Sequence, residues 1–370
     1  MVRAIAFVRV ERITLFGKGG IGKSTIACGI TASLAASGRR VLHVGCDPKH
    51  DSTAALLGGQ MIEPVIDRIS TVKGVRIDDI VVRSSLGIDC VEAGGPAAGV
   101  GCGGRGITRM LEIFDEAGLL APDRYDLALY DVLGDVVCGG FAAPLRRGIG
   151  EKVVIVTSEE LMSLYAANNI ARAVVHYASN GIALAGLVVN LKDPDADRHV
   201  VERFAERINT KILAWVTRDP LIRKAEYERT TVTEMAPLSA IATNFRELAE
   251  HLYALDVRGT PLPTPMEESQ FYTAARTRFR ADVKVDVPPA PTPKPAPEQA
   301  EVRPASLTRG PKVAAARQRK QVETERYVHE LRAGARAVRL GLVGADEALR
   351  RLQAAFPDLA QGLRREELLT

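Results

Sequence analysis

The sequence has few cysteines and no long uncharged apolar segment. Five cysteines in 370 residues are too few, and odd in number, for a disulfide scaffold, so any special cysteine is expected to be reactive or a metal ligand. No run of about 18 uncharged apolar residues occurs, and Arg3, Arg9 and Glu11 interrupt the start of the chain. These absences argue against a membrane span and a signal peptide, and we expect a soluble, cytoplasmic protein.

Net charge is absent from the first three quarters of the chain. Residues 281–370 hold 16 Lys or Arg and 12 Asp or Glu, whereas residues 1–280 hold 33 of each, so the formal charge of +4 lies in the tail. A neutral body of this length can bury a full hydrophobic core, which excludes a disordered or collagen-like chain.

Short apolar segments rich in β-branched residues recur along the body. Most of them do not alternate with polar residues, which indicates strands buried on both faces, as in a parallel sheet covered by helices. We therefore expect one α/β domain with a doubly wound, mainly parallel sheet over residues 11–260, after an N-terminal extension of residues 1–10. The expected strands are 12–16, 41–45, 88–92, 126–130, 152–157, 185–190 and 211–216.

A proline-rich segment separates this body from the tail. Six prolines fall within ten residues from Pro288, which favours an extended polyproline spacer, and we assign residues 261–311 to the linker. Residues 312–370 are expected to form a basic helical module. One charged helix is expected over 312–335, and a second starts near Asp346 and ends at Pro357, with Leu349, Leu352 and Phe356 on one face.

The segment Gly17–Ser24 matches the phosphate-loop pattern G-x-x-x-x-G-K-S between an expected strand and an expected helix. Its glycines let backbone amides surround phosphates, Lys23 reaches the outer phosphates and Ser24 supplies a hydroxyl to Mg²⁺. The alternative is a glycine-rich turn without a ligand. The combined strand, loop and helix favour the nucleotide site.

A second lysine, Lys18, lies near the start of this loop. It resembles the signature lysine of the deviant Walker family, which includes partitioning and septum-site ATPases, arsenite-transport ATPases and nitrogenase iron proteins. In that family the lysine reaches across a dimer to the nucleotide of the partner. The alternative is a solvated loop lysine.

Aspartates follow later strands at the edge where doubly wound sheets bind ligands. Asp51 and Asp131 are candidate Mg²⁺ groups, because a hard cation that binds phosphates takes one or two carboxylate oxygens directly or through water. Asp47 or Asp135 could orient the attacking water. For each aspartate alone, turn formation or helix capping is the competing interpretation.

Two of the five cysteines, Cys102 and Cys138, are embedded in glycine. Glycine lets backbone amides approach sulfur, which stabilises an anionic iron–sulfur cluster. Two thiolates suffice for a four-iron cluster only if an identical chain supplies two more, so a cluster on a two-fold axis is inferred, with a zinc site or buried thiols as alternatives. Cys28, Cys46 and Cys90 are expected to be small buried or nucleotide-adjacent residues.

Several blocks together resemble the iron protein of nitrogenase and its relatives. The blocks are Gly17–Thr25, Gly45–Thr53, Gly94–Gly106, Tyr130–Ala142 and Tyr165–Asn169, in the family's order and spacing. The resemblance covers residues 11 to 260. It implies a P-loop ATPase that is a homodimer, with one 4Fe-4S cluster held by Cys102 and Cys138 of both chains and with MgATP in each subunit.

The resemblance also implies how the protein works. Hydrolysis would drive docking to a catalytic partner and transfer of one low-potential electron, with ferredoxin or flavodoxin as the electron source and with no membrane or nucleic-acid partner. The stretch from Asp131 to Asp135 would join the nucleotide to Cys138, and Arg105 matches an arginine at the docking face.

The resemblance assigns the remaining roles by position. The nucleotide-binding residues would be Gly17, Lys18, Gly19, Gly20, Ile21, Gly22, Lys23, Ser24, Thr25, Lys49, Asn190, Asp219 and Glu226. The magnesium residues would be Ser24, Asp51 and Asp131, and the catalytic residues Lys18, Asp47 and Asp135.

Departures from the family narrow the interpretation. Ala97 and Ala98 stand where many nitrogenase iron proteins carry Glu-Pro, Arg223 replaces a common glutamine, and the proline linker has no recognised counterpart. We therefore favour a nitrogenase-like reductase such as methylthio-alkane reductase over nitrogenase proper or chlorophyllide reductase. The alternative is a partitioning-type ATPase that binds DNA or a membrane through its basic tail, although interspersed acidic residues favour a solvated helix face there.

Overall fold

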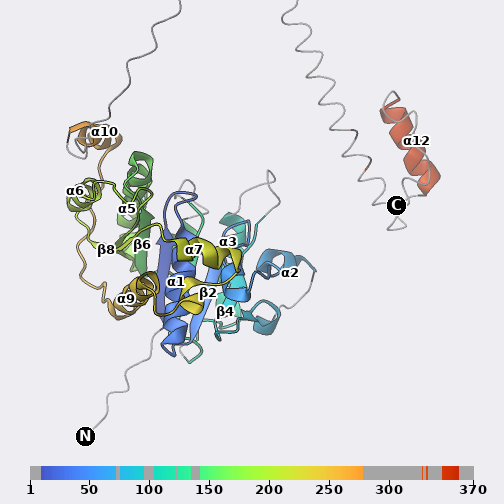
Figure 1. The fold of residues 1–370 in the computed structure, drawn as a ribbon. Coiled ribbons are helices and arrows are strands. Elements are labelled where there is room, and N and C mark those ends of the chain that lie inside the picture. Colours follow the sequence, from blue (N-terminus) through green and yellow to red (C-terminus); the bar gives the residue numbers. More distant parts are fainter. Residues whose placement is uncertain are drawn as a thin grey trace, which may run out of the picture. The chain divides into compact units, whose positions relative to one another are not determined.

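The computed structural model describes residues 10–71, 76–95, 104–121, 123–134, 142–277 and 344–357, together with Tyr327 and Leu331. The chain divides into two units, residues 1–285 and 286–370. Figure 1 shows the first unit as a central sheet with helices on both faces.

The sheet has eight strands in the order β3-β4-β2-β5-β1-β6-β7-β8. All neighbouring pairs are parallel except β3 and β4, which are antiparallel. The seven expected strands are all present, so the prediction of a doubly wound, mainly parallel sheet is confirmed. The strands are β1 (Glu11–Phe16), β2 (Val41–Cys46), β3 (Val82–Arg83), β4 (Asp89–Glu92), β5 (Leu127–Val132), β6 (Lys152–Thr157), β7 (Ala183–Asn190) and β8 (Ile212–Val216).

Helices cover both faces of the sheet, as expected for strands buried on two sides. On one face lie α2 (Val65–Thr71), α3 (Gly104–Glu116), α4 (Ala143–Arg146), α5 (Leu161–Tyr177), α6 (His199–Arg207) and α10 (Glu268–Thr277). On the other face lie α1 (Lys23–Ala36), α7 (Pro220–Tyr227), α8 (Val232–Met235) and α9 (Ala240–Ala254). Short 3₁₀ turns are η1 (Ala54–Leu57), η2 (Ile77–Asp79) and η3 (Ala178–Asn180).

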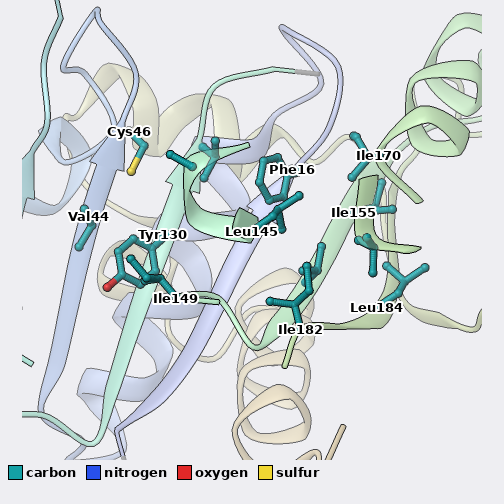
Figure 2. Close-up of a cluster of buried hydrophobic side chains, with 14 of the residues drawn as sticks. Phe16, Val44, Cys46, Tyr130, Leu145, Ile149, Ile155, Ile170, Ile182 and Leu184 are labelled. Carbon is teal, nitrogen blue, oxygen red and sulfur yellow. The ribbon is translucent and has the colours of Figure 1, made fainter. Parts of the chain in front are cut away.

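Successive residues of each strand point to opposite faces, so each central strand feeds two cores. Val44 and Tyr130 face the core under α3 and α5, and Figure 2 shows them with Phe16 and Ile155 from the neighbouring strands. The intervening residues, including Leu129 on β5, pack beneath α1 and α9. This alternation matters for the site, because it places every second residue of β2, β4 and β5 on the face of α1.

The folded body continues past residue 260, where the sequence analysis began the linker. Asn168 exchanges two hydrogen bonds with the backbone of Met266, each 2.8 Å long. Phe271 of α10 is fully buried, and its ring lies 5.3 Å from that of Tyr165 in an edge-to-face contact. Segment 260–277 therefore completes the core beside α5, and Asn168 of the Tyr165–Asn169 block holds it in place.

The described part of the second unit contains α12 (Ala345–Ala355). This helix matches the expected second tail helix, with Leu352 and Phe356 buried. The ring of Phe356 lies 5.6 Å from that of Tyr327. The first expected tail helix lies outside the described residues apart from Tyr327 and Leu331. Within the described ranges no helix is both long and apolar enough to cross a membrane.

Candidate nucleotide site and its connection to the cysteines

The phosphate loop joins β1 to α1 with a backbone that glycine alone adopts without strain. Gly17, Gly20 and Gly22 have φ values of +152°, +73° and +95°. A Cβ at Gly17 would lie 2.2 Å from the carbonyl oxygen of Val156 on β6. No side chain caps the start of α1, so the first amides of the helix are free to bind phosphate oxygens.

Lys23, the first residue of α1, lies across this loop. Its side chain is buried, with 7% of the residue exposed. The ammonium donates hydrogen bonds to the carbonyl of Gly17 at 2.9 Å and to that of Lys18 at 3.2 Å. The loop therefore places one buried positive charge at the helix N-terminus, as phosphate binding requires.

Asn190 closes the loop from the end of β7. Its amide donates to the carbonyl of Ile21 at 2.7 Å, and a Cβ at Gly22 would lie 2.5 Å from the same amide nitrogen. Lys192 reaches the carbonyl of Gly20 at 3.2 Å. A cavity of about 440 Å³ opens here; it is lined by Asn190, Asp219, Glu226 and Thr25 among others. The structure thus brings together Asn190, Asp219 and Glu226, which the sequence analysis assigned to nucleotide binding.

A second cavity, of about 260 Å³, lies on the other side of Thr25. The Thr25 hydroxyl donates to Glu226 at 3.4 Å, and both residues line both cavities. Ser24 and Asp51 line the second cavity only. Two magnesium candidates, Ser24 and Asp51, and the nucleotide candidates Thr25 and Glu226 therefore meet around the first turn of α1.

Asp131, near the end of β5, is the most deeply buried of the described magnesium candidates. It is 4% exposed, and burial raises the pKa of its carboxyl, opposed by the nearby hydroxyls of Ser24 and Ser52 and by Lys23. Oδ2 accepts a hydrogen bond of 2.6 Å from Ser52. Oδ1 is buried and has no hydrogen-bond partner within the described part of the chain. A buried carboxylate oxygen without a partner is costly unless a ligand completes it.

Strand β4, which is separated from β5 by β2, carries a second buried carboxylate that the sequence analysis did not single out. Glu92, at the end of β4, is fully buried, and burial raises its pKa to about 8. Its Oε1 accepts from the backbone amide of Thr53 at 2.7 Å and from the Thr53 hydroxyl at 2.9 Å. Ser52 and Thr53 therefore fasten the segment after Asp51 to β5 and β4, the two strands that flank β2. The signal in the sequence was an acidic residue at the carboxyl end of an expected strand, where sheets of this kind bind ligands.

Other candidates already use part of their polar groups in local structure. Asp47 accepts from the amide of Lys49 at 2.8 Å, which closes a turn. Asp219 accepts from the amide of Leu221 at 2.8 Å and caps α7. The Lys18 carbonyl accepts a hydrogen bond from Lys23, and the Lys18 residue itself is partly buried. For Asp47 the competing interpretation, turn formation, is thus present in the fold, and Asp219 also has a local role as a helix cap. Both keep a second carboxylate oxygen.

Three of the five cysteines are described, and each is buried. Burial raises the thiol pKa well above its usual value for Cys28 and Cys46, and to about 12 for Cys90. Cys28 donates to the carbonyl of Ser52 at 3.1 Å, and Figure 2 shows Cys46 at the end of β2 above Val44. Iron and zinc bind the thiolate form, so these sites disfavour metal ligation. Cys102, Cys138 and Asp135 lie outside the described residues, as does the side chain of Arg105.

A parallel α/β sheet, a glycine-rich loop ahead of α1 and carboxylates at the ends of β4 and β5 define a nucleotide-binding protein of the P-loop class. Comparison with known proteins gives the family. Residues 11–277 match the family described as "4Fe-4S iron sulfur cluster binding proteins, NifH/frxC family". The chain belongs to this family, and its cofactors are accordingly a 4Fe-4S cluster and MgATP.

Curated relatives agree with this assignment. Nitrogenase iron protein 2 of Methanothermococcus thermolithotrophicus is 41% identical over 282 residues, which cover 72% of this chain and 96% of that protein. The nitrogenase iron protein of Methanococcus voltae is 43% identical over 263 residues, with 70% and 93% covered. The recognition of the nitrogenase iron protein family from sequence blocks is confirmed.

Solved structures share the fold at lower identity. The septum site-determining protein MinD with Mg-ADP from Pyrococcus horikoshii OT3 superposes with a TM-score of 0.54 at 22% identity, over 66% of this chain and 96% of that one. A ParA family ATPase from Chlorobium tepidum TLS gives 0.51 at 18% identity, over 66% and 99%. These likenesses show the P-loop ATPase fold alone.

Proposed function

We propose that this chain is the ATP-dependent reductase component of a nitrogenase-like enzyme. Two copies share one 4Fe-4S cluster through Cys102 and Cys138 of each, and MgATP hydrolysis is coupled to transfer of single electrons to a catalytic partner protein. Membership of the family supports a reductase that acts on a partner. The specific partner, and ferredoxin or flavodoxin as the source of electrons, belong to this proposal.

The residues around the phosphate loop fit MgATP. The loop amides and Lys23 would hold the phosphates, and Asn190, Asp219 and Glu226 would line the base and ribose. Ser24, Asp51 and Asp131 would hold Mg²⁺, whose charge offsets that of the phosphates. The unpartnered Oδ1 of Asp131 is the kind of buried acceptor that a cation or its bound water completes.

The remaining candidates belong to the same proposal. Lys18 would contact the nucleotide of the partner subunit, Lys49 the phosphates, and Asp47 or Asp135 the attacking water. Each group is matched to its role by charge: a lysine offsets phosphate charge, and a carboxylate accepts a proton or orients water.

The single observation that carries the coupling is the position of Asp131. This residue is buried at the end of the central strand β5, with one oxygen held by Ser52 and the other without a hydrogen-bond partner among the residues that the structure describes. Asp135 and Cys138 follow four and seven residues later on the same chain. A carboxylate that changes partners with the nucleotide would move the start of this short segment, which gives coupling a physical path.

The cysteine chemistry supports the same ligands for the cluster. The three described thiols are buried with raised pKa values, which leaves Cys102, between Gly101 and Gly103, and Cys138, followed by two glycines. Backbone amides near sulfur stabilise the charge of a cluster. Arg105, three residues after Cys102, would lie at the surface that docks the catalytic partner.

Iron content tests this proposal. We expect protein purified without oxygen to be brown, with about four irons per dimer. A colourless protein that takes up no iron under competent reconstitution would contradict the proposal and favour a partitioning-type ATPase that uses the basic tail to bind DNA or a membrane.

We propose that the enzyme served by this chain is a methylthio-alkane reductase rather than nitrogenase proper or chlorophyllide reductase. Ala97, Ala98 and Arg223 depart from the common nitrogenase pattern, and the proline-rich segment with its helical tail follows the family match. The test reconstitutes the chain with its catalytic partner, MgATP and reductant. Release of a thiol from a methylthio-alkane is expected; reduction of dinitrogen or of a chlorophyllide instead would contradict this choice.

A further inference from the structure

A buried chain of hydrogen bonds runs from α1 through β2 to Asp131. The Thr31 hydroxyl lies 2.9 Å from Nδ1 of His43, Nε2 of His43 lies 2.9 Å from the Ser52 hydroxyl, and Ser52 donates to Oδ2 of Asp131 at 2.6 Å. Thr31 and His43 are fully buried, and Ser52 is 1% exposed. This series of hydrogen bonds links α1, the helix after the phosphate loop, to the magnesium candidate Asp131 through the protein interior.

The donors and acceptors of this chain allow one arrangement. Ser52 has one hydroxyl hydrogen and gives it to Asp131, so its oxygen must accept from Nε2–H of His43. Burial lowers the pKa of His43 to about 3, so the imidazole is neutral and carries one N–H. Nδ1 is then an acceptor, and Thr31 donates to it. Every polar atom of His43 is satisfied in this tautomer.

Packing alone does not explain a histidine at this position. His43 lies in the middle of β2, opposite Leu129 on β5 and Cys90 on β4, among residues that are apolar. A leucine would fill such a place without the desolvation of an imidazole. The imidazole is the group there that can both accept from α1 and donate to Ser52.

We propose that His43 is a positioning residue for the magnesium–nucleotide complex. Through Ser52 it fixes Oδ2 of Asp131 and so leaves Oδ1 oriented for the cation. This inference rests on the proposed function, in which Asp131 belongs to the magnesium shell. Groups outside the shell that orient a ligating carboxylate change metal affinity when they are removed.

Manganese, which substitutes for Mg²⁺ and is detected when free by electron paramagnetic resonance, tests the proposal on the full-length protein with ADP. We expect Asp131→Asn to weaken manganese binding strongly and His43→Leu to weaken it about tenfold, while ADP binding without metal is unchanged in both. His43→Gln keeps an N–H at the place of Nε2 and should restore binding to within about twofold of wild type, a rescue that a purely structural role would not give.

Two further variants separate positioning from loss of stability. Val44→Ala removes apolar volume from the same strand and should leave manganese affinity unchanged. Ser52→Ala should weaken binding as His43→Leu does, and the double variant should bind no more weakly than the weaker single one, because the two residues act in series. Ser52→Ala also tests the chain if His43→Leu does not fold.

The possible failures are distinguishable. Wild-type manganese affinity in Asp131→Asn would overturn the magnesium role of Asp131, and the inference with it. Impaired manganese binding in Asp131→Asn with wild-type affinity in His43→Leu and Ser52→Ala would overturn the role of His43 but not that of Asp131. A loss of affinity in Val44→Ala as large as that in His43→Leu would do the same.

Discussion

The two edges of the central sheet treat their charged groups in opposite ways. At the amino ends of the strands, carboxylates are paired with basic side chains. Asp126 accepts from the backbone amide of Arg40 at 2.8 Å and from two of its guanidinium nitrogens. Lys152 pairs with Glu11 at 2.6 Å and also donates to two carbonyls at the end of α9. This edge is held together by its own contacts.

At the carboxyl ends, charges are left incomplete. Asp131 and Glu92 are buried more deeply than Asp126, yet each has one oxygen without a hydrogen-bond partner in the described part of the chain. An unpartnered buried carboxylate lowers stability. The difference indicates that the amino edge stabilises the fold and that the carboxyl edge is organised to bind, as parallel α/β sheets commonly are.

The largest expected effect concerns Cys138, which follows β5 in the sequence. Cys138→Ser should abolish the cluster while nucleotide binding is retained, because the proposed iron ligand is lost but the phosphate loop is untouched. Iron analysis and ADP titration measure the two properties. Cys90→Ser, inside β4, is the control and should keep its iron. Full iron content in Cys138→Ser would show that the ligand assignment is wrong.

At the amino edge, the largest effect is expected at Lys152. The side chain is 4% exposed and holds Glu11 and two carbonyls. Lys152→Met should lower the free energy of unfolding by about 3 kcal/mol, because it leaves these acceptors without their donor. Urea unfolding measures this loss, and ATPase activity per folded molecule should stay at the wild-type value. A large loss of ATPase activity without a loss of stability would contradict the assignment of a stabilising role to the amino edge.

A matched pair of aspartates compares the edges directly. Asp131→Asn should reduce ATPase activity about 100-fold without lowering stability, because it removes a buried, incompletely bonded charge. Asp126→Asn should lower the free energy of unfolding by about 1 kcal/mol, since Arg40 is half-exposed, and should keep ATPase activity. The opposite pattern, with activity lost only at Asp126, would contradict the division of the sheet.

A smaller effect concerns the pH dependence of stability. The pKa of His43 is near 6.5 in the unfolded chain and about 3 in the folded protein. Below pH 6.5 the unfolded chain therefore binds one more proton, and stability falls as the pH falls, by up to about 1.4 kcal/mol per pH unit. His43→Gln removes this contribution. Between pH 7.5 and 5.5 the variant should lose about 1 kcal/mol less than wild type in urea unfolding; equal losses would contradict the buried neutral imidazole.

The smallest effect is expected from the tail. Truncation after Arg280 keeps α10 and should change the free energy of unfolding by less than about 0.5 kcal/mol, with iron and ATPase activity preserved. Truncation after Thr260 removes Phe271 from the core and should cost about 3 kcal/mol or more. Loss of the folded dimer in the variant truncated after Arg280 would refute the independence of residues 281–370.

The sequence predicted the fold and the phosphate loop because both depend on local patterns. Uninterrupted apolar strands and the glycine spacing of Gly17–Ser24 need no tertiary information. The end of the domain was placed too early, since segment 260–277 lacks a strong pattern and is held by contacts with distant helices, such as those of Asn168 and Arg172 with Met266.

The buried polar network was not predictable in the same way. In the sequence His43 is one polar residue within an apolar strand, a feature that a tolerated core residue would share. Glu92 is one of two acidic residues in a strand of four, which does not mark it as buried. Their function depends on which residues of the loop after Asp51 reach them, and only the packing of β2, β4 and β5 against that loop determines this. Cys102 and Cys138, by contrast, were marked by their glycine neighbours.

The most direct test of the central claim, that the carboxyl edge joins the nucleotide to the cluster, is the electron paramagnetic resonance spectrum of the reduced protein with and without MgATP. The account predicts that MgATP changes the cluster spectrum of wild type and leaves that of Asp131→Asn unchanged at equal iron content. A full MgATP-dependent change in Asp131→Asn would contradict the claim.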